Sequence, residues 1–568
     1  MDGTPSTPAG PIDRQPSFVQ AELPLPAPVP RAREGAAPQR TIVRVLSGDF
    51  VGIEGRPVEV QVDVSARGYP GFHIVGLPGK SIRESRERIR AALRNCGFKF
   101  PHDERVVINL APTAEQKEGS GFDLAVTLGL LLASRQLTLS EGMLRGDGLV
   151  GGVGFLGEVG LNGEIRPVPG ALLVAHALKE RGTSRIVVPR ENARETALVE
   201  GMVCFAAGDL HEAVAALQGR LPAFCRDTGS GDAGKHALLH RDMEGLDFAE
   251  VKGQEASKRG LIVAAAGEHN LLMVGPPGVG KTMLARRLPG ILPPLDLPEG
   301  LEVARISSVL GQVVQDHLVR SRPFRSPHHT ISYVGLVGGG THLKPGEVTR
   351  AHRGVLFLDE FPEFNRRALE ALREPLEEGR ITVSRSAGTV TFPARFLLVA
   401  AMNPCPCGYL GHPRRACSCT PQAIRVYRQR ISGPLLDRMD LFLEVGSVPV
   451  EVMLDGGRAR PGLGSSDLRE LVRKARGLQA LRWGERMPNS QVPLGRLLAG
   501  GCLRKAALDK LREGADHLGL SARGFTRLLR VARTVADLEG ARWVEAHHLS
   551  EALHYREPLA ASVGERIA

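Results

Sequence analysis

Short runs of consecutive apolar residues in the middle of the chain predict strands that are buried on both faces. Such runs occupy residues 271–274, 354–358 and 396–402. Each run is too short for an independent helix and stops at a glycine, an acidic residue or an asparagine. This is the pattern of central strands in a buried sheet. We therefore expect an α/β core in this part of the chain.

Other segments carry strand and helix periods of their own. Residues 58–64 and 105–110 are β-branched runs between helical patterns, which predict a separate α/β unit. Apolar residues alternate on both sides of residues 386–388 and predict a hairpin: Ile381, Val383, Val390 and Phe392. Near the C-terminus, helical spacing predicts a helix over residues 521–540 with one apolar face: Phe525, Leu528, Leu529, Ala532, Val535 and Ala536. Its Arg527, Arg530 and Arg533 are expected to be solvated or to face another subunit.

These patterns divide the chain into six segments. Residues 1–40 hold nine prolines without an apolar period and are expected to form a disordered tail. Polar, glycine-rich stretches predict linkers at both ends of the central core. The predicted order is a tail (1–40), an α/β domain (41–221), a linker (222–244), the core (245–449), a second linker (450–466) and a largely helical region (467–568).

Composition narrows the classes of protein that fit. The chain has 568 residues, of which 42% are hydrophobic, so several domains can each bury a core. No apolar run approaches the ~18 residues of a membrane-spanning helix, so we expect a cytoplasmic protein without membrane contact. Eight cysteines in so long a chain argue against a disulfide scaffold. The formal net charge of +11 makes a polyanion a reasonable partner.

The first apolar run leads into a phosphate-binding loop. Residues 275–282 read GPPGVGKT and are followed by a helical pattern. In this setting backbone N–H groups can surround an oligophosphate at the positive end of a helix, Lys281 reaches the outer phosphates and Thr282 holds Mg²⁺. The residues predicted to bind ATP are Gly275, Pro276, Pro277, Gly278, Val279, Gly280, Lys281 and Thr282.

The second apolar run ends in two carboxylates, Asp359 and Glu360. A nucleotide hydrolase needs one carboxylate for its metal and another for the attacking water. Asp359 is therefore predicted to bind Mg²⁺ together with Thr282, and Glu360 to act as the catalytic base.

Four cysteines follow the third apolar run in two CxC pairs: Cys405, Cys407, Cys417 and Cys419. Clustered thiolates suit tetrahedral Zn²⁺, with His412 as a substitute ligand. Buried free thiols or a redox-labile pair are the alternatives.

The core motifs, taken in order, resemble those of AAA+ ATPases of the magnesium-chelatase type. The resemblance implies that Asn403 is sensor 1, which orients the attacking water, although an asparagine before Pro404 can also simply start a turn. It implies that Arg438, in the run GPLLDRMD, is an arginine finger acting in trans on a neighbouring subunit, with Arg430 as the competing candidate. It also implies that Arg523 is a second nucleotide-sensing arginine.

Several basic residues are candidates for contact with nucleic acid. Arg380 and Arg385 flank the predicted hairpin, and Arg414 and Arg415 lie between the two cysteine pairs. Arginines in such positions can contact phosphates. The paired His328 and His329 are equally compatible with a structural and a functional role.

The N-terminal α/β segment resembles the Lon-protease fold through motifs at residues 109–112, 117–125 and 157–170. Ser120 lies one position from the serine expected in true Lon proteases, and residues 171–173 replace the catalytic lysine. Because a serine without a base is a weak nucleophile, we expect a non-proteolytic relative.

Together the motifs resemble the ComM/YifB family of magnesium-chelatase-like AAA+ proteins over about residues 41–557. The resemblance implies a P-loop AAA+ core with an N-terminal Lon-like domain and a C-terminal helical lid. It implies a homo-oligomeric ring, expected to be a hexamer, that uses ATP and Mg²⁺ to drive branch migration on single-stranded or branched DNA during recombination and natural transformation. A metal-chelatase motor subunit that drives a partner enzyme is the alternative, and an ATP-dependent protease is a third.

Overall fold

The structure, a computed structural model, divides the chain into two compact units. It describes residues 42–113, 117–139, 149–224, 246–312, 321–340, 343–385, 388–449, 463–484, 487–499, 503–517 and 520–556. The first unit reaches to Ser230 and the second contains the rest of the chain apart from residues 311–316. The predicted tail and most of both predicted linkers lie outside the described residues.

The N-terminal unit is built on a mixed seven-stranded sheet in the order β3-β4-β2-β1-β5-β8-β9. Its strands are β1 (Val43–Val51), β2 (Glu54–Ser65), β3 (Gly71–Val75), β4 (Arg105–Ala111), β5 (Leu149–Phe155), β8 (Arg185–Pro189) and β9 (Val203–Ala207), and a ribbon joins β6 (Glu158–Val159) to β7 (Ile165–Arg166). The strand patterns predicted at residues 58–64 and 105–110 are confirmed in β2 and β4, where every second residue is buried.

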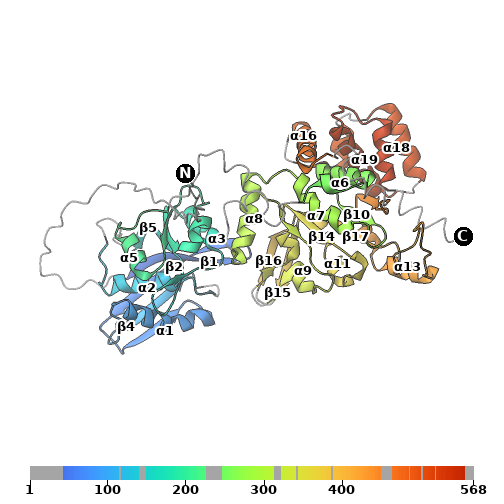
Figure 1. Cartoon of the computed structure of the whole chain (residues 1–568). Helices are drawn as coiled ribbons and strands as arrows, with labels where there is room; N and C mark the ends of the chain where they lie inside the picture. Colours follow the sequence, from blue (N-terminus) through green and yellow to red (C-terminus); the bar gives the residue numbers. More distant parts are fainter. Residues whose placement is uncertain are drawn as a thin grey trace, which may run out of the picture. The chain divides into compact units, whose positions relative to one another are not determined.

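The helices described beside this sheet are α1 (Lys80–Asn95), α2 (Asp123–Ala133), α3 (Ala171–Glu180), α4 (Arg190–Thr196) and α5 (Leu210–Leu217). Figure 1 labels α1, α2, α3 and α5. Helix α2 is buried along nearly its whole length because it is apolar on all sides and packs on β1 and β2. The resemblance of this mixed sheet to the Lon-protease fold stays a prediction.

The second unit contains a five-stranded parallel sheet in the order β11-β14-β17-β10-β18. Its strands are β10 (Leu271–Val274), β11 (Phe324–Arg325), β14 (Val355–Leu358), β17 (Leu397–Met402) and β18 (Leu441–Glu444). The three predicted apolar runs are thus confirmed as β10, β14 and β17, which lie side by side (Figure 1). Because all five strands are parallel, the residues that follow them meet at one edge of the sheet.

Helices and short strands surround this sheet. The helices are α6 (Glu255–Gly267), α7 (Lys281–Ile291), α8 (Leu297–Val309), α9 (Tyr333–Val337), α10 (Glu347–Arg350), α11 (Arg366–Glu370), α12 (Arg373–Glu378), α13 (Pro421–Gln429) and α14 (Gly433–Leu436). Single turns of 3₁₀ helix are η2 (Phe248–Glu250), η4 (Phe361–Glu363) and η5 (Asn489–Gln491), and β12 (Gly338–Gly339) pairs with β13 (Lys344–Pro345). The predicted hairpin is confirmed as β15 (Arg380–Arg385) paired with β16 (Gly388–Pro393), with the predicted apolar residues buried.

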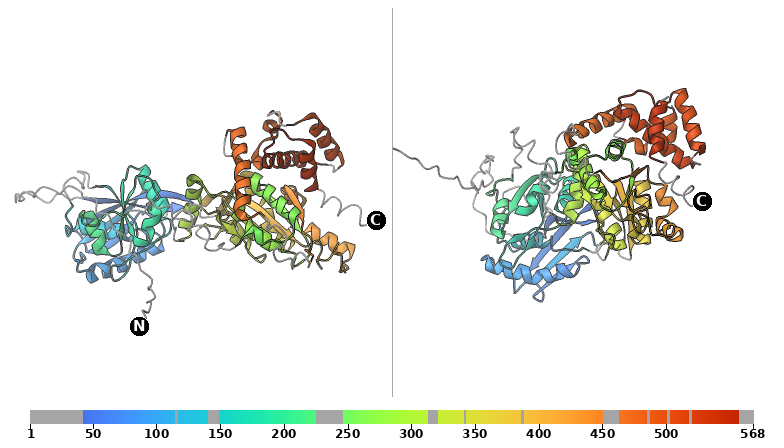
Figure 2. Two further views of the ribbon diagram at one scale, coloured as in Figure 1. Left: turned by 45° about the horizontal axis from the view of Figure 1, so that its top comes forward. Right: turned by 45° about the vertical axis from the view of Figure 1, so that its right-hand side comes forward.

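The C-terminal helices share one hydrophobic core with the sheet. They are α16 (Ser465–Trp483), α17 (Leu494–Ala499), α18 (Lys505–His517), α19 (Ala522–Leu538) and α20 (Ala546–His554). Helices α16 and α19 pack on α6, and Figure 2 shows these red helices gathered against the green segment that contains α6. Among the described residues, no helix combines the length and the apolar character needed to cross a membrane.

Helix α19 confirms the predicted helix but corrects the expectation for its arginines. Arg533 is 0% exposed, pairs with Asp537 at 3.0 Å and donates to two backbone carbonyls. Arg527 is mostly buried beside Asp440, and Arg530 donates to the Val492 carbonyl. The expectation of solvated arginines was wrong because α19 is covered by other helices on several sides, and polar partners compensate the buried charges.

Candidate nucleotide site

The predicted phosphate loop connects the end of β10 to the start of α7. Gly278 and Gly280 have φ values of 79° and 93°, which residues with a side chain seldom adopt. A Cβ atom at Gly275 would lie 2.2 Å from the carbonyl oxygen of Val445. The loop therefore needs glycine at these three positions, and it places the positive N-terminus of α7 at the carboxyl edge of the sheet.

Lys281 is held directly over this loop. The side chain is buried, and its Nζ donates to the carbonyl oxygens of Gly275 at 2.7 Å and Pro276 at 2.9 Å and to Oδ1 of Asn403 at 3.1 Å. Burial lowers the pKa of Lys281, and the negative charge of Asp359 opposes this shift. The ammonium is thus positioned by neutral oxygens, which a phosphate oxygen can replace as a stronger acceptor.

The two residues predicted to hold Mg²⁺ lie in contact. Thr282 Oγ1 donates to Asp359 Oδ2 at 2.7 Å, although the residues are 77 positions apart. A hydroxyl and a carboxylate beside a phosphate loop fit the oxygen ligands that Mg²⁺ prefers. Thr282 and Asp359 are therefore the residues that would hold the ion.

Glu360 is exposed and adopts a left-handed backbone conformation with φ of 51°. Its Oε2 lies 2.9 Å from Nδ1 of His329, which follows β11. This contact gives His329 a place beside the predicted catalytic carboxylate, which the sequence left open. His329 follows β11 and Glu360 follows β14, and these two strands are neighbours in the sheet. The sequence alone does not give this order, so it could not place His329 beside Glu360.

Asn403 follows β17, the strand between β10 and β14. This order places the amide between the phosphate loop and the acidic strand end, where it contacts Lys281. The structure therefore brings together Lys281, Thr282, Asp359 and Asn403, and Glu360 adjoins Asp359 in the chain.

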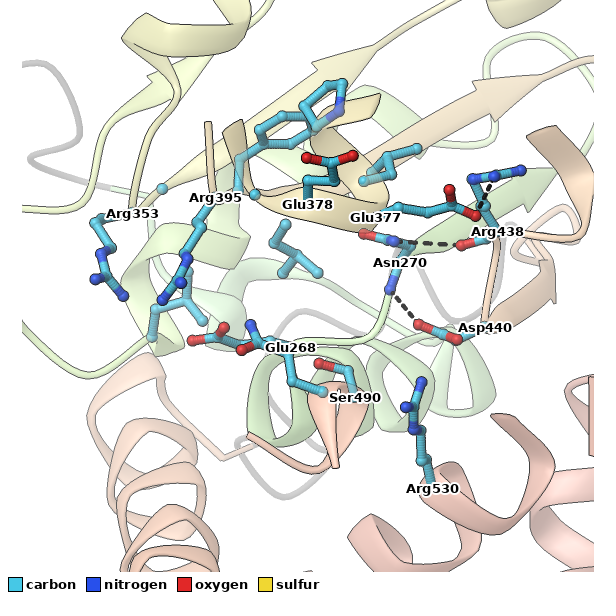
Figure 3. A pocket seen from close by; sticks show the side chains of 18 of the residues that line it. Glu268, Asn270, Arg353, Glu377, Glu378, Arg395, Arg438, Asp440, Ser490 and Arg530 are labelled. Atoms are coloured by element: carbon cyan, nitrogen blue, oxygen red, sulfur yellow. Dashed lines mark hydrogen bonds and ion pairs between the residues drawn. The ribbon is translucent and has the colours of Figure 1, made fainter. Parts of the chain in front are cut away.

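Arg438 lies at the opposite edge of the same sheet. Its backbone carbonyl accepts a bond from Nδ2 of Asn270, the residue before β10, whereas the phosphate loop follows β10 (Figure 3). The Arg438 side chain is 4% exposed, and its guanidinium contacts Glu377 and donates to the Pro434 carbonyl at 2.5 Å. A strand of four residues separates the edges by about 13 Å. Arg438 therefore does not reach the phosphate loop of its own chain.

Arg523 lies beside Arg438 instead of the phosphate loop. Its guanidinium is 3.8 Å from Glu377 and 4.0 Å from Asp437, and its side chain is 64% exposed. The competing candidate, Arg430, pairs with Glu363 at 2.5 Å, three residues after Glu360. The three arginines thus lie at two different edges of the sheet.

A pocket of about 390 Å³ opens at the edge that holds Arg438. The residues that precede β10, β14 and β17 line it (Figure 3). Its seven arginines outnumber its four carboxylates: Arg322, Arg353, Arg395, Arg438, Arg476, Arg527 and Arg530 against Glu268, Glu377, Glu378 and Asp440. Burial lowers the pKa of Arg438 and Arg530. The sequence did not single out this pocket, because its residues come from segments far apart in the chain.

The four predicted zinc ligands converge on one point. Their sulfur atoms all lie within 4.8 Å of one another, with Cys405, Cys407 and Cys417 separated by 3.4 to 3.6 Å. His412 accepts the N–H groups of Arg414 and Arg415 at Nδ1. Among the described residues, the group of close ligand atoms at this point contains the four cysteines without His412. The thiols are free, and their arrangement is compatible with a Zn²⁺ site.

The candidate nucleic-acid residues do not form one patch in the described contacts. Arg414 and Arg415 are exposed on the cysteine loop, and Arg415 stacks on Tyr409 at 4.1 Å. Arg380 is exposed but paired with Glu378 at 3.0 Å. Arg385 ends β15, and its side chain lies outside the described residues.

Ser120 in the N-terminal unit contacts the Glu158 carboxylate through its hydroxyl group. Residues 171–173, at the place of the Lon lysine, are buried at the start of α3. The nearby Lys117 donates from Nζ to the Pro112 carbonyl. The expectation of a non-proteolytic domain stays a prediction.

Comparison with known proteins finds magnesium-chelatase families along most of the chain. The family described as "Magnesium chelatase, subunit ChlI" matches residues 247–453, "Subunit ChlI of Mg-chelatase" matches residues 58–192, and "Magnesium chelatase, subunit ChlI C-terminal" matches residues 462–556. The 38 kDa magnesium-chelatase subunit of Rhodobacter capsulatus is 28% identical over 325 residues, which cover 53% of this chain and 84% of that protein.

Two relatives are similar over nearly their whole length. The protein YifB of Salmonella typhimurium is 42% identical over 520 residues, which cover 89% of this chain and 95% of the relative. The competence protein ComM of Haemophilus influenzae is 40% identical over 531 residues, with 90% and 97% covered. The chain therefore belongs to the ComM/YifB family of magnesium-chelatase-like proteins.

Proposed function

We propose that this protein is an ATP-hydrolysing ring motor that remodels DNA. The observation that carries the proposal is the division of the catalytic groups between two edges of one sheet. The phosphate loop, Asp359 and Asn403 lie at the carboxyl edge, whereas Arg438 lies at the amino edge. The magnesium-chelatase-like AAA+ family supports the ATPase part.

In the proposed reaction, the residues of the carboxyl edge have separate tasks. Lys281 and the loop N–H groups bind the phosphates, and Thr282 and Asp359 hold Mg²⁺, which neutralises charge on the phosphate oxygens when bound. Asn403 orients the attacking water. Glu360 accepts its proton, and His329 fixes the carboxylate at 2.9 Å before the reaction.

Arg438 and Arg523 would complete the site of a neighbouring subunit. Both contact Glu377, so a single carboxylate holds the pair at the amino edge. A neighbour's triphosphate can replace that carboxylate as the partner of both guanidinium groups. Contacts of this head-to-tail kind close into a ring, for which we propose a hexamer.

DNA is proposed as the substrate on three grounds. The relative from Haemophilus influenzae is called a competence protein, and the chain carries a net charge of +11. Arg414 and Arg415 are exposed, and Arg414 has no side-chain partner among the contacts described. If phosphate contacts bind DNA, the affinity falls steeply between 50 and 200 mM salt.

The test is three-strand branch migration by the purified protein with ATP and Mg²⁺, together with ATPase rates measured with and without forked DNA. We expect strand exchange that needs ATP and an ATPase rate that forked DNA increases. The Glu360→Gln variant is the control for contaminating helicases. Stimulation by a chelatase partner without any effect of DNA would favour the metal-chelatase alternative, and salt-insensitive DNA binding would argue against phosphate contacts.

A further inference from the structure

The cysteine loop is in direct contact with the phosphate loop. Gly408 lies between the two cysteine pairs with φ of 84°, and a Cβ atom there would lie 2.7 Å from Cδ of Pro277. The same Cβ would lie 3.9 Å from Cγ of Asn403. A side chain at position 408 would therefore clash with Pro277 of the phosphate loop and would also reach Asn403, so Gly408 lies close to two parts of the proposed ATP site.

The sulfur positions match a tetrahedral metal site. Four thiolates at about 2.3 Å from one Zn²⁺ are about 3.8 Å apart. The sulfurs of Cys405, Cys407 and Cys417 are 3.4 to 3.6 Å apart, and that of Cys419 lies within 4.8 Å of each of them. Backbone N–H groups also point at the sulfurs, from Leu410 to Cys405 and from Cys407 to Cys419. Such N–H contacts stabilise and orient thiolate ligands.

Only Pro404 separates the sensor asparagine from the first cysteine. Cys405 is fully buried, and Arg428 of α13 donates to the Pro404 carbonyl at 3.3 Å. Asn403 in turn accepts a bond from Lys281. Cys405 and Asn403 are therefore joined by only two peptide units, next to a hydrogen bond that holds the intervening Pro404.

We propose that the four cysteines bind one Zn²⁺ ion and that this ion holds Asn403 and Pro277 in the geometry needed for ATP turnover. The proposal rests on the proposed ATP hydrolysis at this site. It extends the proposed function because it assigns the ion a role in holding the catalytic residues in place. The cysteines are positioning residues, since no sulfur is assigned a contact with the nucleotide.

The first test removes the metal site from the full-length protein. We expect about one zinc per wild-type chain by elemental analysis and none in the Cys417→Ser, Cys419→Ser double variant. ATP turnover should fall about tenfold or more, as for other losses of support around a site. Cys96→Ser, in the other unit, is the control that should keep both zinc and turnover.

The second test separates contact from metal binding. Gly408→Ala adds the methyl group that meets Pro277, so turnover should fall while zinc stays bound. Gly411→Ala controls for backbone strain, because Gly411 in the same loop has a similar φ of 78°. Hydrogen exchange of residues 275–282 and 403–410 should rise on zinc removal, and this measurement needs no ATPase activity.

The outcomes distinguish this proposal from the proposed function. Wild-type protein without zinc, zinc retained in the double variant, or zinc lost with unchanged turnover and unchanged exchange would each overturn the zinc proposal. Absence of ATP hydrolysis by wild type would overturn the proposed function instead, and the zinc content and exchange would still be measured. Circular dichroism melting would show whether any variant has simply failed to fold.

Discussion

Glu360 has a backbone conformation that residues other than glycine seldom adopt, and His329 contacts its carboxylate. Such conformations cluster where side-chain placement matters for function. We expect Glu360→Gln to keep ATP binding and to lower turnover by about 10²- to 10⁴-fold, because it removes the proton acceptor alone. Equilibrium binding and single-turnover hydrolysis measure the two effects separately.

Lys281→Ala is the comparison variant for this prediction. It removes the cation that the loop holds in place, so nucleotide affinity itself should fall. If the Glu360→Gln variant hydrolysed ATP at the wild-type rate, a group other than Glu360 would have to activate the water.

The buried His352 makes the stability of the fold depend on pH through its hydrogen bond to Glu302, outside the proposed ATP site. His352 accepts the Arg395 N–H at Nδ1, so Nε2 carries the proton and donates to Glu302 at 2.9 Å. This bond and Arg353 lower the pKa of Glu302 to about 2. A carboxyl with a lowered pKa stabilises the fold above its ordinary pKa, and this contribution disappears as pH falls toward 2.

We therefore expect Glu302→Gln to cost about 1 kcal/mol near pH 6, since the side chain is 41% exposed and solvent weakens the pair. The cost should shrink as the pH is lowered from 4.5 toward 2. Urea denaturation of both proteins at several pH values measures it, and a cost independent of pH would exclude this origin.

The residues identified from the sequence belong to short contiguous motifs. The contacts that the sequence did not reveal join residues that are far apart in the chain. The phosphate loop and the pair Asp359 and Glu360 are contiguous, so a local pattern identifies them. The contact of Arg438 with Glu377 spans 61 positions. Such a contact depends on sheet order, which no local pattern contains.

At the scale of elements, the central strands β10, β14 and β17 were predicted because each is apolar throughout. Helix α19 shows the limit of periodicity. The sequence predicts its apolar face, but it also predicts arginines that are solvated or face another subunit, whereas the helix packs against other helices of its own chain. Polar periodicity does not distinguish water from a buried carboxylate such as Asp537.

Arg533 should consequently be important for stability. Arg533→Ala leaves Asp537 with fewer partners and two backbone carbonyls without their donors. We expect a loss of about 3–5 kcal/mol in the free energy of unfolding. The matched control is Arg512→Ala on α18, because that side chain is 78% exposed and should cost almost nothing. Equal midpoints in chemical denaturation would refute the role assigned to Arg533.

At the scale of the whole molecule, the proposed ring predicts dominance of a defective subunit. Arg438→Ala should bind ATP normally, since Arg438 lies at the edge away from the phosphate loop. Mixed with wild type, it should reduce activity by more than its share of the chains, because each defective subunit also disables a neighbour's site. ATPase rates across a series of mixing ratios measure this effect.

Arg430→Ala is the control for the mixing experiment, since Arg430 pairs with Glu363 near the carboxyl edge of its own chain. If the ATPase rate fell in proportion to the fraction of Arg438→Ala chains, that arginine would have no role in a neighbour's site. A nonlinear loss with Arg430→Ala alone would transfer the role to Arg430.

Because the length of β10 separates the phosphate loop from Arg438, we expect turnover to depend on protein concentration. A single chain that carries the two halves of a reaction centre on opposite edges cannot join them by any small motion of its own. Turnover per chain should then rise with protein concentration and vanish on dilution, even with saturating ATP. Halving the amount of this protein in a cell would cost more than half of its output.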